Sequence, residues 1–340
     1  MPRTESGPVP LDPAAAEAAV EVAVRAPSIH NTQPWSWRLD PDGLVLRADR
    51  TRQLAVADPD GHSLMLSCGA AMLLTETALH AQGWQLETTV LPDRDDPDLL
   101  ARFRPMGRGE PDALAVTAVQ AAKRRRSDRR PFAAHPVPPE LAEELQAAGS
   151  DASARVHFPT QEDEQINLAV AVSRADRVER HDQAYLDEMN HWLHDPDVHA
   201  MVDGIPTAAI PHVPHDAPRR SNVPLRDFEV GVTGKLLIDR DVDEKPLIGV
   251  VLTDFDHPRD QLHAGACLMR FMIAAELRGM TTCLLSQAVD FPAFRARFQE
   301  FMGWVGHPQI MVRVGYPSGP ADQLVRTPRR GAAAVLTLAV

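Results

Sequence analysis

The most prominent pattern along the chain is a pair of long apolar segments. Ser63–Gln82 carries hydrophobic residues on nearly every side of a helix, which predicts a buried central helix rather than a surface one. Asp260–Arg278 is predicted to form a second long apolar helix. Each segment runs up to a glycine, Gly83 or Gly279, and glycine is well suited to end a helix. We therefore expect two halves, each built around one buried helix.

Shorter patterns surround each long segment. A charged, proline-bearing stretch, 92–111, carries no predicted element and separates a first half, residues 1–110, from a second half, residues 111–340. Apolar spacing and cap residues predict helices over Pro13–Arg25, Asp112–Arg124, Pro139–Ala148, Glu162–Arg180 and Gln183–Leu193. Alternation or short apolar runs predict strands over Trp35–Leu39, Leu44–Ala48, Trp84–Leu91, Ala154–Phe158, Leu247–Thr253 and Gln309–Val314.

One long segment, at about 195–227, has no usable periodicity. It is rich in proline and histidine and lies within the second half. A segment of this length without predicted structure is typical of a lid, a binding loop or disorder. The sequence leaves these alternatives open.

Composition excludes several classes of protein. The 340 residues include 35 Lys and Arg against 47 Asp and Glu, a net charge of −12, which argues against a general nucleic-acid binder. The three cysteines have no C-x-x-C spacing, so neither a zinc knuckle nor a redox pair is expected. No apolar stretch reaches the roughly 20 residues of a membrane span, and the polar start shows no signal peptide. We expect a cytoplasmic protein.

Basic residues gather at one place in this acidic chain. Lys123–Arg130 holds six basic residues in eight positions, with the hydroxyl of Ser127 among them. One interpretation is a solvated basic face or a nucleic-acid patch. The other is a phosphate clamp, because guanidinium groups bind phosphate through two parallel hydrogen bonds and a hydroxyl adds another donor.

The loop Pro27–Trp35 concentrates polar side chains between two prolines. Asn31 and Gln33 each offer donors and acceptors, which is the combination needed to bind the edge of a heteroaromatic ring or a polyol. The alternative is an ordinary turn, since serine, asparagine and proline all favour turns.

Together these segments resemble a known family. The loop closely resembles the A-P-S-x-x-N-x-Q-P-W motif of the FMN-dependent nitroreductases, and Arg125–Arg129 resembles their R-R-S-x-R motif. Three weaker matches follow in the family's order: Gly279–Cys283, Gly315–Pro317 and Pro328–Arg330. The resemblance covers most of the chain except about 195–227, and it is strongest to the Acg-type NAD(P)H nitroreductases of actinobacteria.

The resemblance implies a homodimeric α+β fold with central antiparallel sheets, long buried helices and FMN at the subunit interface. Here the order of the motifs is reversed, since the loop precedes the arginine motif. The first half lacks an arginine motif ahead of its loop, and the second half lacks a matching loop. We therefore expect a tandem fold, a fused pseudo-dimer that is monomeric by internal fusion and keeps one composite FMN site.

Residue roles follow from the same resemblance. The phosphate and ribityl chain of FMN are assigned to Arg125, Arg126, Ser127 and Arg129, with Arg329 also reaching the phosphate. The isoalloxazine and ribityl chain are assigned to Ser28, Asn31 and Gln33. Backbone N–H groups facing flavin N5 are assigned to Ser286 and Gln287.

The implied activity is an FMN-dependent oxidoreductase. NADH or NADPH would deliver hydride to the flavin, and a nitroaromatic or quinone would then take the electrons, with no catalytic side chain required. If the 195–227 segment closes over the flavin, the alternative is an FMN-binding or storage protein without useful turnover; the segment could also cover the second, inactive site.

A metal site is a rival interpretation of the histidines. His191-x-x-His194 and His212-x-x-His215 have the spacing of metal ligands on a helix. They complete no known ligand set, so no metal is expected.

Overall fold

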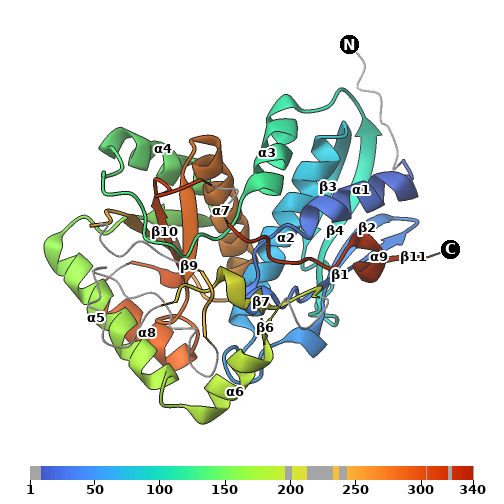
Figure 1. The fold of residues 1–340 in the computed structure, drawn as a ribbon. Coiled ribbons are helices and arrows are strands. Elements are labelled where there is room, and N and C mark those ends of the chain that lie inside the picture. The colour runs from blue at the N-terminus through green and yellow to red at the C-terminus, as the bar shows by residue number, and fades with distance from the viewer. Residues whose placement is uncertain are drawn as a thin grey trace.

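Two large sheets, each packed against a long helix, form the framework of the molecule (Figure 1). The computed structural model describes residues 9–195, 201–212, 233–236, 243–303, 305–320 and 324–339. Helices and strands are mixed, as expected for an α+β protein. None of the helices formed by these residues is long and apolar enough to cross a membrane.

The first sheet has the strand order β11-β1-β2-β4-β3. Its neighbours pair antiparallel except at one edge, where β11 runs parallel to β1. Because β11 lies near the end of the chain, the C-terminal residues cross to the sheet of the first half (Figure 1). The strands are β1 Trp35–Asp40, β2 Gly43–Ala48, β3 Trp84–Val90, β4 Leu99–Arg108 and β11 Leu336–Leu338, and the long helix α2 is His62–His80.

The second sheet is antiparallel, with the order β5-β8-β10-β9. With β11 left aside, each sheet has two strands before its long helix and two after it, and the last of these four strands inserts beside the second. The orders β1-β2-β4-β3 and β5-β8-β10-β9 are therefore the same connection pattern. These elements are β5 Ala154–His157, β8 Leu247–Thr253, β9 Thr281–Leu285, β10 His307–Gly315 and α7 Pro258–Leu277.

The two long helices pack against each other through small residues. A Cβ atom added to Gly69 of α2 would lie 2.1 Å from the carbonyl oxygen of Leu262 in α7. A Cβ atom added to Gly265 of α7 would lie 2.0 Å from the carbonyl oxygen of Leu66 in α2. The contact is reciprocal, because the glycine of each helix packs against the leucine of the other. In both helices the glycine follows the leucine by three residues.

This helix pair joins the two hydrophobic cores. One core holds the fully buried Trp35 and Trp37 of β1, and it also includes Leu262 and Met269 from α7. The other core lies between α7 and the second sheet and includes Leu66 from α2. Each long helix thus contributes to both cores, which explains why both segments are apolar on nearly every side.

The other elements surround this framework. Asp12 and Asp112 cap the first turns of α1 and α3 by accepting backbone N–H groups, as their positions ahead of apolar helices predict. The remaining helices are α1 Pro13–Ala23, α3 Ala113–Arg124, α4 Pro139–Gly149, α5 Glu162–Glu179, α6 Gln183–His191, α8 Pro292–Met302 and α9 Ala332–Val335. A small parallel pair is formed by β6 Leu193–His194 and β7 Ile205–Pro206.

The stretch 92–111 was expected to hold no element, and β4 lies within it. Its Leu100 and Phe103 are fully buried, while Arg102 between them forms an ion pair with Asp40 on β1. The charge of Arg102 is typical of a linker in the sequence, but in the structure it is neutralised by Asp40, so β4 can form within the sheet. The predicted boundary at residue 110 falls after this strand and stays a prediction.

Part of the segment 195–227 lies among the described residues, at 195 and 201–212. It contains β7 and a short 3₁₀ turn at Thr207–Ala209. The rest of that segment lies outside the described residues. The helix α8 and strand β11 are further elements that the hydrophobic pattern did not predict.

Candidate functional site

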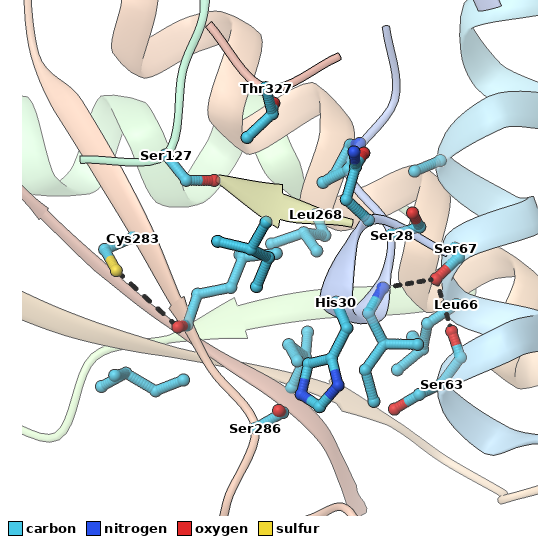
Figure 2. Close-up of a pocket in the computed structure, with 18 of the residues that line it drawn as sticks. Ser28, His30, Ser63, Leu66, Ser67, Ser127, Leu268, Cys283, Ser286 and Thr327 are labelled. Carbon is cyan, nitrogen blue, oxygen red and sulfur yellow. Dashed lines mark hydrogen bonds between the residues drawn. The ribbon is translucent and has the colours of Figure 1, made fainter. Parts of the chain in front are cut away.

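A cleft that is partly open to solvent lies where the two halves meet (Figure 2). It is lined by the loop after α1, one face of α2, the turn after α3, the end of β9 and residues near the C-terminus. Of the residues predicted from the sequence, the cleft brings together Ser28, Asn31, Arg125, Arg126, Ser127, Arg129, Ser286 and Arg329. Gln33 and Gln287 are fully buried and do not line it.

The loop after α1 is held in an unusual backbone conformation. His30, Asn31 and Gln33 have positive φ angles of 44°, 57° and 53°. Such angles are uncommon for residues other than glycine and cluster at functional sites. The loop is fixed by Ser28, whose Oγ accepts the Gln33 N–H at 2.9 Å, and by Ser67 of α2, whose Oγ accepts the Ile29 N–H at 3.3 Å.

The two amide side chains of this loop bind backbone groups. Asn31 Nδ2 donates to the Gly204 carbonyl at 2.9 Å and to the Pro328 carbonyl at 3.0 Å. Gln33 Nε2 donates to the Val202 carbonyl at 2.9 Å, and its Oε1 accepts the Arg330 N–H at 2.8 Å. Gln33 therefore joins the loop to segment 201–212 and to the C-terminal residues from a position behind the cleft wall.

The arginine-rich turn is anchored to the second sheet. The Asp128 N–H donates to the Thr282 carbonyl of β9 at 2.9 Å. The buried Asp128 carboxylate accepts two hydrogen bonds from the Arg130 guanidinium, at 3.0 and 2.9 Å. Arg130 is thus a structural residue of the turn. The exposed Arg124 forms an ion pair with Glu276, so Arg125–Ser127 and Arg129 are the part of the run that faces the cleft.

Buried positive charge gathers at this end of the cleft. Burial lowers the pKa of Arg125 to about 10, and burial together with the charges of Arg125 and Arg25 lowers the pKa of Arg329 to about 9. Burial and the charge of Arg326 also lower the pKa of Arg126. Among the described residues, no carboxylate lies within ion-pair distance of Arg125, Arg126 or Arg329.

Several guanidinium N–H groups at this end have no acceptor. Nε and Nη1 of Arg125, Nε of Arg126 and Nε of Arg329 are buried without a hydrogen-bond partner in the described part of the chain. An unmet buried donor on a charged group is costly, and an anion that accepts from it would relieve the cost. The geometry at this end of the cleft is that of an anion-binding site.

The rest of the cleft has a different character. Leu66 from α2 and Leu268 from α7 add apolar side chains to its lining. Figure 2 shows Ser127 and Thr327 at one end of the cleft, and His30, Ser63 and Ser286 toward the other. The cleft therefore suits an elongated ligand that has an anionic group at one end. The rest of such a ligand would be apolar on its faces and polar at its edge.

Comparison with known proteins places this chain in a family. The sequence model of the nitroreductase family matches residues 122–316. "Putative NAD(P)H nitroreductase Rv3131" of Mycobacterium tuberculosis is 33% identical over 91% of this chain and 87% of its own length. The chain belongs to the nitroreductase family. "Putative NAD(P)H nitroreductase acg" of the same organism is 28% identical, over 92% of each chain.

Membership of the nitroreductase family makes this chain an oxidoreductase with that family's α+β fold, and confirms the family resemblance and fold class predicted from the motifs. Among solved structures, a nitroreductase with bound FMN from Bacteroides fragilis is similar at a TM-score of 0.40 and 14% identity, over 66% of this chain and 98% of that one. The assignment to the family rests on the sequence comparisons.

Some residues of the cleft were not predicted. Ser63 and Ser67 present hydroxyl groups from α2, and Thr327 does so from the C-terminal residues. Two serines on an otherwise apolar helix, spaced one turn apart, are a sequence signal that could have identified that face. His30 lies in the predicted loop, yet its own motif position is variable and gave no signal.

Ile205 and Pro211 also line this cleft, so the described part of the 195–227 segment lies at the arginine-bearing site. The segment is held there by Asn31 and Gln33, and by an ion pair of Arg52 with Asp203. His215 of the rival metal pattern lies outside the described residues. Within the described residues, no three His, Cys, Asp or Glu side chains gather in a metal-binding arrangement.

Proposed function

We propose that this chain is an FMN-dependent oxidoreductase that takes electrons from NADH or NADPH and passes them to a nitroaromatic or quinone-type acceptor. The observation that carries the proposal is the group of buried guanidinium N–H donors without acceptors at one end of the cleft. A phosphate monoester supplies about two negative charges and three acceptor oxygens. It would therefore satisfy donors that the protein itself leaves unmet.

The rest of the cleft fits the rest of FMN. The hydroxyls of Ser28 and Ser67 lie along the loop and α2, where a polyol chain can bind. The apolar side chains of Leu66 and Leu268 suit the faces of a tricyclic ring. When bound, FMN supplies the hydride chemistry, while the protein positions it and excludes water.

We further propose that the two halves, residues 1–110 and 111–340, are a fused pseudo-dimer. The shared strand order and the reciprocal contact of Gly69 and Gly265 support this, because a two-fold axis makes each partner repeat the other's contact. The cleft takes its loop from the first half and its arginines from the second. On this proposal the chain is a monomer with a site of its own.

The residue of the second half that corresponds to Ser63 supports the proposal of a single site. The spacing that matches Leu66 with Leu262 also matches Ser63 with Arg259. Arg259 Nη2 donates to the Val90 carbonyl at the end of β3, at 2.8 Å. The cleft therefore has the small hydroxyl of Ser63 at a position where the other half has the guanidinium group of Arg259, which is bound to the end of β3.

Reduction of the bound flavin by a nicotinamide nucleotide tests the activity. We expect NADH or NADPH to bleach the absorbance of protein-bound FMN under anaerobic conditions, and a quinone to restore it. The FMN-storage alternative is favoured by Ile205 and Pro211, because they place part of the 195–227 segment in the cleft wall. Reduction by dithionite but by neither nucleotide would contradict the oxidoreductase and support storage.

A further inference from the structure

The reduction of a nitro group or a quinone consumes protons as well as electrons. Hydride transfer places a negative charge on an acceptor oxygen, and a positioned acid can neutralise that charge in the transition state. The acid has to lie in the cleft, at the end away from the anion-binding arginines. Ser286 lies there, on the turn that follows β9 (Figure 2).

The hydroxyl of Ser286 is connected to a buried carboxyl group. Ser286 Oγ donates to Asp290 Oδ2 at 3.1 Å, and the Asp290 N–H donates to the Ser286 carbonyl at 2.9 Å. Asp290 is fully buried. Since a serine hydroxyl both donates and accepts, it can pass a proton from a carboxyl group to a ligand.

A second fully buried carboxyl group lies close to the first. Asp58 accepts the N–H groups of Ser63 and Leu64 at the start of α2, both at 2.8 Å. Burial, together with the charges of Asp290 and Asp60, raises the pKa of Asp58 to about 7 despite these two hydrogen bonds. Near neutral pH, Asp58 is therefore a proton reservoir, and it accepts the N–H of Ser63, a residue that lines the cleft.

The other charged groups near Asp58 are paired with one another. Arg295 of α8 forms ion pairs with Asp60 at 2.5 Å and with Asp256 at 3.3 Å. His62 of α2 contacts Gln309 of β10 at 2.8 Å, and burial together with the charge of Arg295 lowers its pKa to about 4, so it is neutral. Asp58 itself has no ion pair with a basic side chain among the described residues.

We propose that Ser286 is the catalytic proton donor to the reduced acceptor, resupplied through Asp290 and Asp58. The inference rests on the proposed oxidoreductase function. The Ser286 hydroxyl turns from Asp290 to the acceptor, and its Oγ–H bond breaks as a new O–H bond forms on the acceptor. Ser286 Oγ then takes a proton from the carboxyl pair. The pair regains its proton from solvent. The electron pair comes from the nicotinamide nucleotide, which is oxidised, and the acceptor is reduced.

Separate measurement of the two half-reactions tests this role. Ser286→Ala is expected to slow reoxidation by a quinone about 100-fold and to slow reduction by the nicotinamide nucleotide much less. Ser286→Thr keeps the hydroxyl and is expected to restore most of that rate. Reoxidation by hexacyanoferrate(III), which accepts electrons without protons, should be equally fast in all three proteins. Equal slowing with hexacyanoferrate(III) would mean that Ser286 only positions groups in the cleft, and would overturn the proposal.

The pH dependence tests the proton reservoir. As pH rises through about 7, Asp58 loses its proton, so the rate with a quinone should fall in the wild type. In Asp58→Asn that fall should disappear. The apo-protein gives a readout that is independent of activity: the carboxyl carbon resonance of Asp58 should titrate near pH 7 and shift to lower pH in Asp290→Asn, but not in Arg124→Ala. A midpoint unaffected by Asp290→Asn would overturn the link between the two carboxyls.

Failure of the proposed function is distinguishable from failure of the proton relay. A protein that takes up no FMN contradicts both. A protein that binds FMN and is reduced by a nicotinamide nucleotide, but whose Ser286→Ala variant reacts with a quinone at the wild-type rate, contradicts the relay alone.

Discussion

Arg125→Ala is expected to weaken FMN binding by about 2–4 kcal/mol, which is about 30- to 1000-fold in the dissociation constant. The guanidinium of Arg125 is buried, and its Nε and Nη1 have no acceptor within the described chain. These donors are available to a ligand phosphate, and alanine removes both. Titration of the apo-protein with FMN, followed by the quenching of flavin fluorescence, measures the change.

A matched control is provided by the preceding residue. Arg124→Ala removes the same side chain from an exposed position whose guanidinium pairs with Glu276, and it should leave the FMN dissociation constant within about twofold. The stability of the apo-protein offers a second control. Because Arg125 is buried without an ion pair, Arg125→Ala should not destabilise the apo-protein. Equal FMN affinity in the two variants would rule out Arg125 as a phosphate ligand.

Gly265→Ala is expected to lower the free energy of unfolding by about 3 kcal/mol. The added Cβ would lie 2.0 Å from the Leu66 carbonyl oxygen and 2.9 Å from the Ala70 nitrogen. Both are backbone atoms, so α2 and α7 have to separate. Alanine is favoured over glycine within a helix by about 1 kcal/mol, which is too little to offset the loss of contact between two buried helices. Urea unfolding followed by circular dichroism measures the effect.

Gly69→Ala should produce a loss of similar size, because its Cβ would lie 2.1 Å from the Leu262 carbonyl oxygen. Gly109→Ala is the control, since its Cβ would meet only the Nε2 atom of Gln85, at 3.5 Å. If Gly265→Ala were as stable as Gly109→Ala, the close reciprocal packing of α2 and α7 would be wrong.

Much of the framework could be predicted from hydrophobic spacing. Local pattern is enough to predict the long helices, the flanking glycines and the first hairpin. The spacing of apolar residues along a short segment shows whether it is buried on every side or on alternate sides. Strand β4 could not be predicted, since Arg102 is compensated by Asp40, which is distant in sequence. Strand β11 is too short to give a pattern and is defined by its pairing with β1.

The candidate site could be predicted where a motif concentrates several residues. The loop at Ser28–Gln33 and the turn at Arg125–Arg129 reach the same cleft, although they lie far apart in the sequence. What no motif shows is the direction of a side chain. Gln33 faces away from the cleft to hold Val202 and Arg330, and Arg130 turns back to pair with Asp128. The contribution of α2 also depends on tertiary packing, because Ser63 and Ser67 belong to the site through the position of the helix.

The central claim is that the two halves of the chain build one FMN site. The most direct test is to titrate the apo-protein with FMN and to determine the stoichiometry at saturation by fluorescence or calorimetry. The account predicts saturation at one FMN per chain in a protein that sediments as a monomer. Two equivalents per chain, half an equivalent shared between two chains, or no saturable binding would contradict it.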